Sequence, residues 1–218
     1  MKESAAKSRI LDVASRLFYE QGYNSTGINQ IIDEANIARA SLYNHFPSKR
    51  DLLTAYIQEA ENLWFTELDK YIAPTKDPKK KLLALFDYRM FRQVRSNFGG
   101  CQFTKIGAEV PRDDLKAFEL ISHQKDRLKL YIKDLLKDIN LDKSQVLNEE
   151  MLTETIFLLL EGATVNASIH KNHESLKQAK KITMTLSNTG WDLIPFIEHL
   201  SNWGKKQLQN ELAAANQD

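Results

Sequence analysis

The chain has 218 residues, 42% of them hydrophobic, and a formal net charge of +1, so it can form a packed core but has no bulk attraction for nucleic acid. No stretch approaches the roughly 18–20 uncharged apolar residues that a membrane span needs. The polar start lacks a signal-peptide core, and the single cysteine excludes an internal disulfide. We therefore expect a soluble cytoplasmic protein without a membrane partner.

The composition of the chain favours helices over strands. Glycine and proline number only eight and five, so the turn signals that separate short strands are missing. The fold class is therefore predicted to be all-α.

Two apolar stripes with helical spacing open the chain. The first stripe comprises Ile10, Val13, Ala14, Leu17 and Phe18. Gly22 follows it and can take the left-handed conformation that closes a helix. A second, shorter stripe comprises Ile28, Ile31, Ile32 and Ala35. We expect Ser25 or Thr26 to cap this helix and Asn36, which tolerates positive φ, to form a tight turn after it.

A short polar helix is predicted next, from Arg39 to Phe46. It buries only two positions and displays polar and aromatic groups, and the surrounding segment from Ala35 to Arg50 has no acidic residue. Pro47 stops this helix, and Ser48 with Asp51 resembles a capping box that opens a long fourth helix. Two short helices joined by a tight turn form a helix-turn-helix, whose second helix lies in the DNA major groove.

This region resembles the DNA-binding domain of the TetR family of repressors. The match runs from Ile10 to Leu53, and its most specific part is the string LYNHFPSK at 42–49. The family commonly has glycine where Asn36 stands, and serine or threonine where Ala38 stands. Alanine cannot cap a helix, a loss of about 1 kcal/mol. The resemblance implies a three-helix helix-turn-helix domain at 1–53, a linking fourth helix at about 48–70, and a larger helical ligand-binding and dimerisation domain at 54–218.

The resemblance also implies DNA contacts for residues in and around the short helices, namely Thr26, Arg39, Ala40, Ser41, Tyr43, Asn44, His45 and Lys49. Thr26 and Lys49 would each reach a phosphate from a helix start. Arg39 and the two residues after it would face base edges, where arginine grips guanine bidentately. From the residues alone, two other interpretations stay open: Tyr43 packs between helices, and His45 caps its own helix or stays solvated.

Further helices are predicted at 79–96, 112–139, 149–171, 174–189 and 191–213, with a short helix after Gly99-Gly100. One apolar stripe comprises Leu152, Ile156, Leu159, Leu160, Ala163 and Ala167. The resemblance implies that Met151–His170 and Ser175–Leu186 form a homodimer interface, mainly within 151–186; an ordinary buried helix is the alternative. The segment after Gly190 would extend the dimer contact or cover a pocket.

The family binds small molecules in this half, so the resemblance implies a pocket for an unidentified inducer. Its candidate lining is aromatic: Phe86, Phe91, Phe103, Phe118, Phe157 and Trp191. Aromatic residues at helical spacing are more often core. Cys101 is a possible redox or electrophile sensor whose thiol pKa Lys105 could lower, or else a buried structural cysteine. His170 and His173 lack further ligand pairs, so we predict no metal and no cofactor.

These observations predict a sequence-specific DNA-binding transcriptional regulator, a repressor that a small-molecule inducer releases from a pseudo-palindromic operator on double-stranded DNA. The chain has no P-loop, dinucleotide-binding turn, nucleophile elbow or zinc-protease motif, which argues against an enzyme. Two alternatives remain: a redox- or electrophile-sensing repressor that acts through Cys101, and an all-helical protein-interaction adaptor that does not bind DNA.

Overall fold

The structure, a computed structural model, describes residues 5–139 and 148–188, and within them every regular element is a helix. The helices are α1 (Ala5–Glu20), α2 (Ile28–Ala35), α3 (Arg39–His45), α4 (Lys49–Ile72), α5 (Pro78–Arg95), α6 (Gln102–Glu109), α7 (Leu115–Lys137), α8 (Glu149–His170) and α9 (Glu174–Asn188). None of these helices is long and apolar enough to cross a lipid bilayer.

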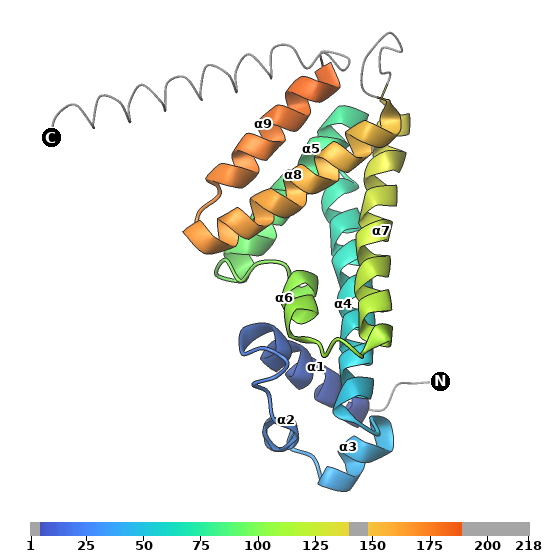
Figure 1. The fold of residues 1–218 in the computed structure, drawn as a ribbon, viewed down its shortest axis with the longest axis vertical. Helices are drawn as coiled ribbons and strands as arrows, with labels where there is room; N and C mark the ends of the chain where they lie inside the picture. The colour runs from blue at the N-terminus through green and yellow to red at the C-terminus, as the bar shows by residue number, and fades with distance from the viewer. Residues whose placement is uncertain (1–4, 140–147, 189–218) are drawn as a thin grey trace, which may run out of the picture.

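The molecule is elongated, with a small head at one end and a larger body at the other (Figure 1). Helices α1, α2 and α3 form the head. In the body, α5 and α7 pack on the far half of α4, and α8 and α9 pack on α5, with α8 also against α7. The predicted runs at 79–96, 112–139, 149–171 and 174–189 correspond to α5, α7, α8 and α9 within three residues. The run at 191–213 lies outside the described residues.

Local backbone chemistry explains the turns of the head. Gly22 closes α1 with a φ of 94°, and Asn36 closes α2 in the left-handed region with φ 49° and ψ 59°. The Ser48 hydroxyl accepts the Asp51 N–H at 3.1 Å and opens α4. These predictions are confirmed. The predicted cap of α2 is wrong, because Gly27 occupies that position and no side chain caps the helix.

Two apolar clusters share α4. The residues from Leu52 to Ala60 belong to the head cluster, and those from Trp64 to Ile72 belong to the body cluster. The head cluster also includes Phe103 and Ile106 of α6, so its core continues well past the predicted boundary at residue 53. The position of that boundary stays a prediction.

Polar contacts join α6 to the head as well. Glu109 accepts the backbone N–H of Asn24 at 2.9 Å, and its carbonyl accepts the Asn24 side-chain amide at 3.0 Å. The Lys105 ammonium donates to the Tyr19 carbonyl at 2.5 Å and lies over the Tyr19 ring. Helix α6 is therefore packed against and hydrogen-bonded to α1 and the turn that follows it.

Candidate nucleic-acid interface

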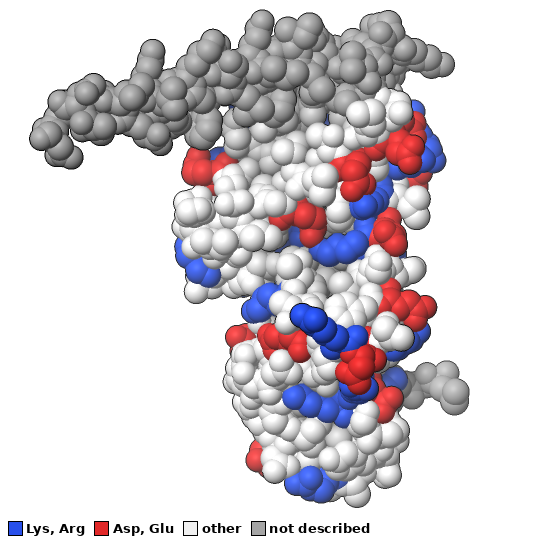
Figure 2. All heavy atoms as spheres, in the orientation of Figure 1, with Lys and Arg blue, Asp and Glu red and all other residues white. Residues whose placement is uncertain are grey.

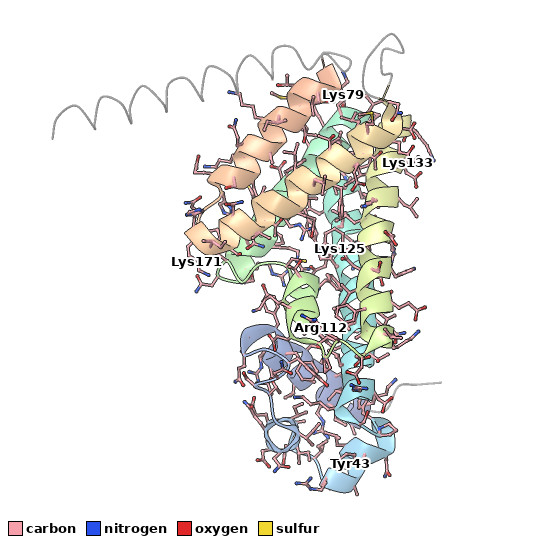
Figure 3. The ribbon with its side chains drawn as sticks, viewed as in Figure 1. Tyr43, Lys79, Arg112, Lys125, Lys133 and Lys171 are labelled. Carbon is pink, nitrogen blue, oxygen red and sulfur yellow. The ribbon has the colours of Figure 1, made fainter. Side chains whose placement is uncertain are left out.

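Helix α3 presents its polar residues at the end of the molecule farthest from the body. Leu42 is fully buried and Phe46 is 3% exposed, and these two side chains anchor the helix on the head. The opposite face is exposed and carries Arg39, Ala40, Tyr43 and Asn44, while Ser41 and His45 are half-buried. Figure 3 shows Tyr43 at this tip, and its 41% exposure does not fit the interpretation in which it packs between helices.

Arg39 carries a positive charge that no carboxylate compensates in the described part of the chain. Its guanidinium donates to the side-chain oxygen of Asn29 on α2 at 2.5 Å. An amide oxygen is neutral, so this bond orients the side chain without pairing its charge. A guanidinium has five N–H donors, and most of them remain free to meet an acceptor outside the protein. This arrangement suits recognition of a guanine edge or a phosphate.

The starts of α2 and α3 both lack a side-chain cap, because Gly27 and Ala38 occupy the capping positions. Uncapped backbone N–H groups at a helix start favour an anion such as a phosphate. The contact expected of the Thr26 side chain is corrected here. Thr26 is 1% exposed, and its hydroxyl donates to the Gly22 carbonyl at 2.7 Å. Any phosphate contact at the start of α2 would therefore be made by backbone N–H groups of that helix.

Lys49 is half-buried at the start of α4. Its ammonium donates to the Tyr23 carbonyl at 2.6 Å and lies 4.3 Å from the centroid of the Tyr23 ring. Burial lowers the pKa of Lys49, and the negative charge of Glu109 opposes that effect. One of its three N–H donors is thus used inside the head, and its predicted phosphate contact would rest on the other two.

We expect Ala38→Ser to raise the free energy of unfolding by about 1 kcal/mol, because serine can accept an N–H bond from the first turn of α3. Ala38 already has the extended backbone of a capping residue, with φ −72° and ψ 145°. Chemical denaturation of the two proteins measures the difference. The matched control is Ala108→Ser at an exposed position inside α6, which should bring no gain. Equal effects of the two changes would contradict the capping argument.

A cluster of charged side chains lies between three helices of the body. The Glu161 carboxylate on α8 accepts from Arg89 of α5 at 3.0 Å and from Lys125 of α7. The Lys125 ammonium also lies 3.4 Å from the Cys101 sulfur. Burial raises the pKa of this thiol, but the charges of Lys125 and Arg89 outweigh it and leave the pKa lowered. The interpretation in which Lys105 lowers the pKa of the thiol is wrong, since Lys125 and Arg89 supply that effect and the Lys105 ammonium bonds to the Tyr19 carbonyl.

The aromatic residues predicted to line a pocket separate into three groups. Phe86 and Phe157 are buried in the body core, and Phe103 lines a narrow cavity beside Trp64, Arg89 and Cys101. Phe91 and Phe118 are 44% and 36% exposed in the subunit, and their role in a ligand pocket stays a prediction. Trp191 lies outside the described residues. In the described residues no three His, Cys, Asp or Glu side chains form a group that could hold a metal ion.

Helix α8 has two apolar stripes, and the stripe identified from the sequence is largely buried within the subunit. Leu152, Ile156, Leu160 and Ala167 are fully buried in the body cluster. A second stripe lies on the exposed side and comprises Met151, Leu158, Gly162, Val165 and Ile169. A Cβ atom added to Gly162 would meet nothing within 4 Å. The spacing of four and three residues along this stripe could have identified it from the sequence.

Comparisons with known proteins agree with this geometry. Residues 10–56 match the model of "Bacterial regulatory proteins, tetR family". The uncharacterized HTH-type transcriptional regulator Rv1255c of Mycobacterium tuberculosis (strain ATCC 25618 / H37Rv) is 37% identical over 92 residues, which cover 42% of this chain and only 45% of that relative. The HTH-type transcriptional repressor DhaR of Mycobacterium sp. (strain GP1) is 22% identical over 208 residues, 93% of this chain and 99% of that protein.

The fold of the whole described chain also has solved counterparts. The crystal structure of a TetR transcriptional regulator from Legionella pneumophila superposes with a TM-score of 0.69 at 24% identity, over 84% of this chain and 97% of that one. An N-terminal helix-turn-helix with a matching sequence and a helical body of matching architecture are thus joined in one chain. Residues 10–56 thus match the DNA-binding region of the tetR family of bacterial regulatory proteins, and the chain shares the fold of solved TetR-family regulators.

Proposed function

We propose that this protein is a homodimeric transcriptional repressor that acts in the cytoplasm, binds a pseudo-palindromic operator and leaves it when a small molecule binds. The observation that carries the proposal is the exposed, acid-free face of α3, from which the uncompensated guanidinium of Arg39 projects. The relative DhaR is named a repressor, which favours repression over activation. We propose no catalytic activity.

The exposed stripe of α8 supports the homodimer. Leu158 and Ile169 are 58% and 66% exposed, an unusual position for large apolar side chains arranged along one helix face. A groove of about 830 Å³ runs between α8 and α9 along Leu158 and Gly162. Figure 2 shows mostly uncharged side chains over the end of α8 that leads into α9. A second copy of α8 and α9 would cover this face and form a four-helix contact.

A dimer also explains how a seven-residue recognition helix specifies an operator. Two copies of α3 held about 34–36 Å apart read two half-sites in successive major grooves. A ligand that favours a different spacing lowers the affinity for DNA. Thermodynamic linkage then requires operator DNA to weaken ligand binding by the same factor, typically about 5- to 150-fold.

Selection of bound duplexes from a random DNA pool tests the proposal. We expect enrichment of an inverted repeat and a steep loss of affinity with salt, since each phosphate contact releases counterions. A protein-interaction adaptor would enrich no sequence. Failure to enrich any sequence, with the protein shown to be dimeric and folded, would contradict the proposed function.

The contact between Lys125 and Cys101 favours a second candidate, an electrophile-sensing repressor. A thiolate reacts with an electrophile far faster than a thiol does, and the nearby ammonium promotes the thiolate. In this version, modification of Cys101 replaces the small-molecule inducer. The thiol is only 8% exposed, which restricts the reaction to small reagents.

Lys125→Gln is expected to shift the alkylation of Cys101 by iodoacetamide to higher pH. The reaction forms an S–C bond and releases iodide, and its rate follows the thiolate fraction. Because the pKa of Cys101 is lowered in the wild type, the pH at which its alkylation rate is half-maximal should lie below that of the variant. Lys105→Gln is the control and should leave the midpoint unchanged, because that lysine bonds to Tyr19. A shift in the control alone would refute the role assigned to Lys125.

A further inference from the structure

A cleft of about 610 Å³ separates the head from the body on one side of the molecule. Helix α1 forms one wall, the middle of α4 forms the floor, and the end of α5 with the loop after it forms the other wall. The lining includes Tyr19, Tyr56, Leu63, Glu67, Arg92 and Arg95. Its volume lies within the range of about 300–1,000 Å³ that is typical of small-molecule sites. It adjoins the narrow cavity beside Cys101 and Phe103, with which it shares Arg92, Gly100 and Gln102.

The floor of the cleft contains a buried hydroxyl without a hydrogen-bond partner. Tyr56 is 2% exposed, and its hydroxyl oxygen has no partner among the residues that the structure describes. Burial raises the pKa of this phenol far above neutrality, so the group remains a donor at any physiological pH. Because a buried polar group without a partner is costly, a bound acceptor would stabilise this arrangement.

The body wall supplies an excess of positive charge. Arg92 and Arg95 share one carboxylate, that of Glu67, at 2.9 and 3.3 Å. Two guanidinium groups against one carboxylate leave one positive charge on this wall. Arg16, on the head wall, is already paired with Glu20 and Glu34. The wall formed by α5 therefore suits a single negative charge.

Apolar surface lies beside this charge. Leu63 is 53% exposed and lies in the cleft with Ala60, and the half-buried ring of Tyr19 continues the same surface. Glu20 and Glu59, exposed carboxylates on α1 and α4, also line the cleft and restrict an anionic group of the ligand to the wall formed by α5. The lining thus combines one anion position, one buried donor and an apolar floor.

We propose that this cleft is a second effector site, which takes a small organic monoanion: a carboxylic acid with an apolar body. The carboxylate accepts hydrogen bonds from Arg92, Arg95 and the Tyr56 hydroxyl, and the apolar part lies on Leu63 and Ala60. The site is distinct from an inducer site in the interior of the body. It is built from the head and the body together, so occupancy acts on the angle between them.

The contacts at the edge of the cleft explain how occupancy would reach the head. The Tyr19 hydroxyl donates to the Gly100 carbonyl at 3.1 Å, across the junction between α1 and the loop before α6. A Cβ atom on Gly99 would lie 2.4 Å from the same hydroxyl, so the loop fits closely against α1. Asn97 and Phe98, in this loop, have left-handed backbones with φ of 48° and 56°. A ligand beside Tyr19 would therefore contact both α1 and the loop before α6, which pack closely against each other.

The test measures dissociation constants of octanoate and 4-phenylbutyrate for the full chain without DNA, beside the neutral analogues 1-octanol and 4-phenylbutan-1-ol. We expect each acid to bind at least about tenfold more tightly than its alcohol, since a charged hydrogen bond is among the stronger contacts. Arg95→Gln should weaken the acids about tenfold and leave the alcohols unchanged. Tyr56→Phe should weaken the acids about fivefold.

Two controls separate binding from folding and from general charge effects. Arg112→Gln removes an exposed arginine outside the cleft and should change nothing (Figure 3). Tyr56→Phe should not lower the melting temperature and is expected to raise it slightly, because the buried hydroxyl it removes has no partner in the described chain. Absence of acid binding at millimolar concentration, equal binding of acids and alcohols, or wild-type affinity in both cleft variants would overturn the proposal. Because no DNA is present, a failure of operator recognition would not affect these results.

Discussion

Arg39→Ala is expected to bind the selected operator at least about 30-fold more weakly than the wild type, because a loss of about 1 kcal/mol in each of two half-sites already gives that factor. A bidentate pair between arginine and guanine contributes about 1–3 kcal/mol of discrimination, and a dimer makes this contact in both half-sites. The bond from Arg39 to Asn29 already holds the guanidinium at the exposed start of α3, so little side-chain freedom remains to be lost on binding. The loss should be specific to sequence, and binding to random DNA should change much less.

Fluorescence anisotropy with the selected duplex and a scrambled duplex measures both affinities. Arg112→Ala is the matched control, since it removes one exposed positive charge away from α3 and should affect both duplexes slightly and equally. A parallel selection with Arg39→Ala should relax the preference at one position in each half-site. An unchanged consensus in that selection would show that Arg39 contacts phosphate or nothing.

Leu158→Glu is expected to convert the proposed homodimer into a monomer and to abolish operator binding at concentrations where the wild type saturates. In a symmetric interface the substitution places a carboxylate in each subunit, and both would be buried without partners. The same contact lies beside Gly162, where an added Cβ would meet nothing within the subunit, so a partner helix can approach closely. Sedimentation velocity measures the assembly, and anisotropy measures the DNA affinity.

Leu130→Glu gives a close comparison, because Leu130 is 61% exposed on α7 and Leu158 is 58% exposed on α8. Both variants replace an exposed helical leucine by glutamate, and both should keep the helical content and the melting behaviour of a folded subunit. Only the change on α8 should alter the assembly. Dimers in both variants would show that the exposed stripe of α8 is not the interface.

Features that depend on neighbouring residues could be predicted from the sequence. The left-handed turn at Asn36, the closure at Gly22 and the cap from Ser48 to Asp51 all follow from interactions within a few residues. The bounds of the longer helices follow from apolar spacing in the same way. The position of α3 could be predicted because its sequence is both locally helical and bounded by Pro47.

Features that depend on tertiary packing could not be predicted from the sequence. Thr26 and the cap position are adjacent, and only the folded turn shows that the Thr26 hydroxyl bonds to Gly22 instead. Helix α8 has two apolar stripes of similar strength, and packing within the subunit decides that Leu152 is buried and Leu158 exposed. Cys101 contacts Lys125, which is 24 residues away, so spacing along the chain could not identify its partner.

The attachment of α6 to the head determines which segments a graft of the helix-turn-helix onto another protein of this fold would need. A chimaera that takes only residues 1–53 from this chain would leave behind Phe103 and Ile106, which complete the head core. It would also separate Asn24 from Glu109 and Tyr19 from Lys105. The transferable unit is therefore discontinuous: it consists of the first four helices together with α6, and a functional graft would need both segments from the same parent.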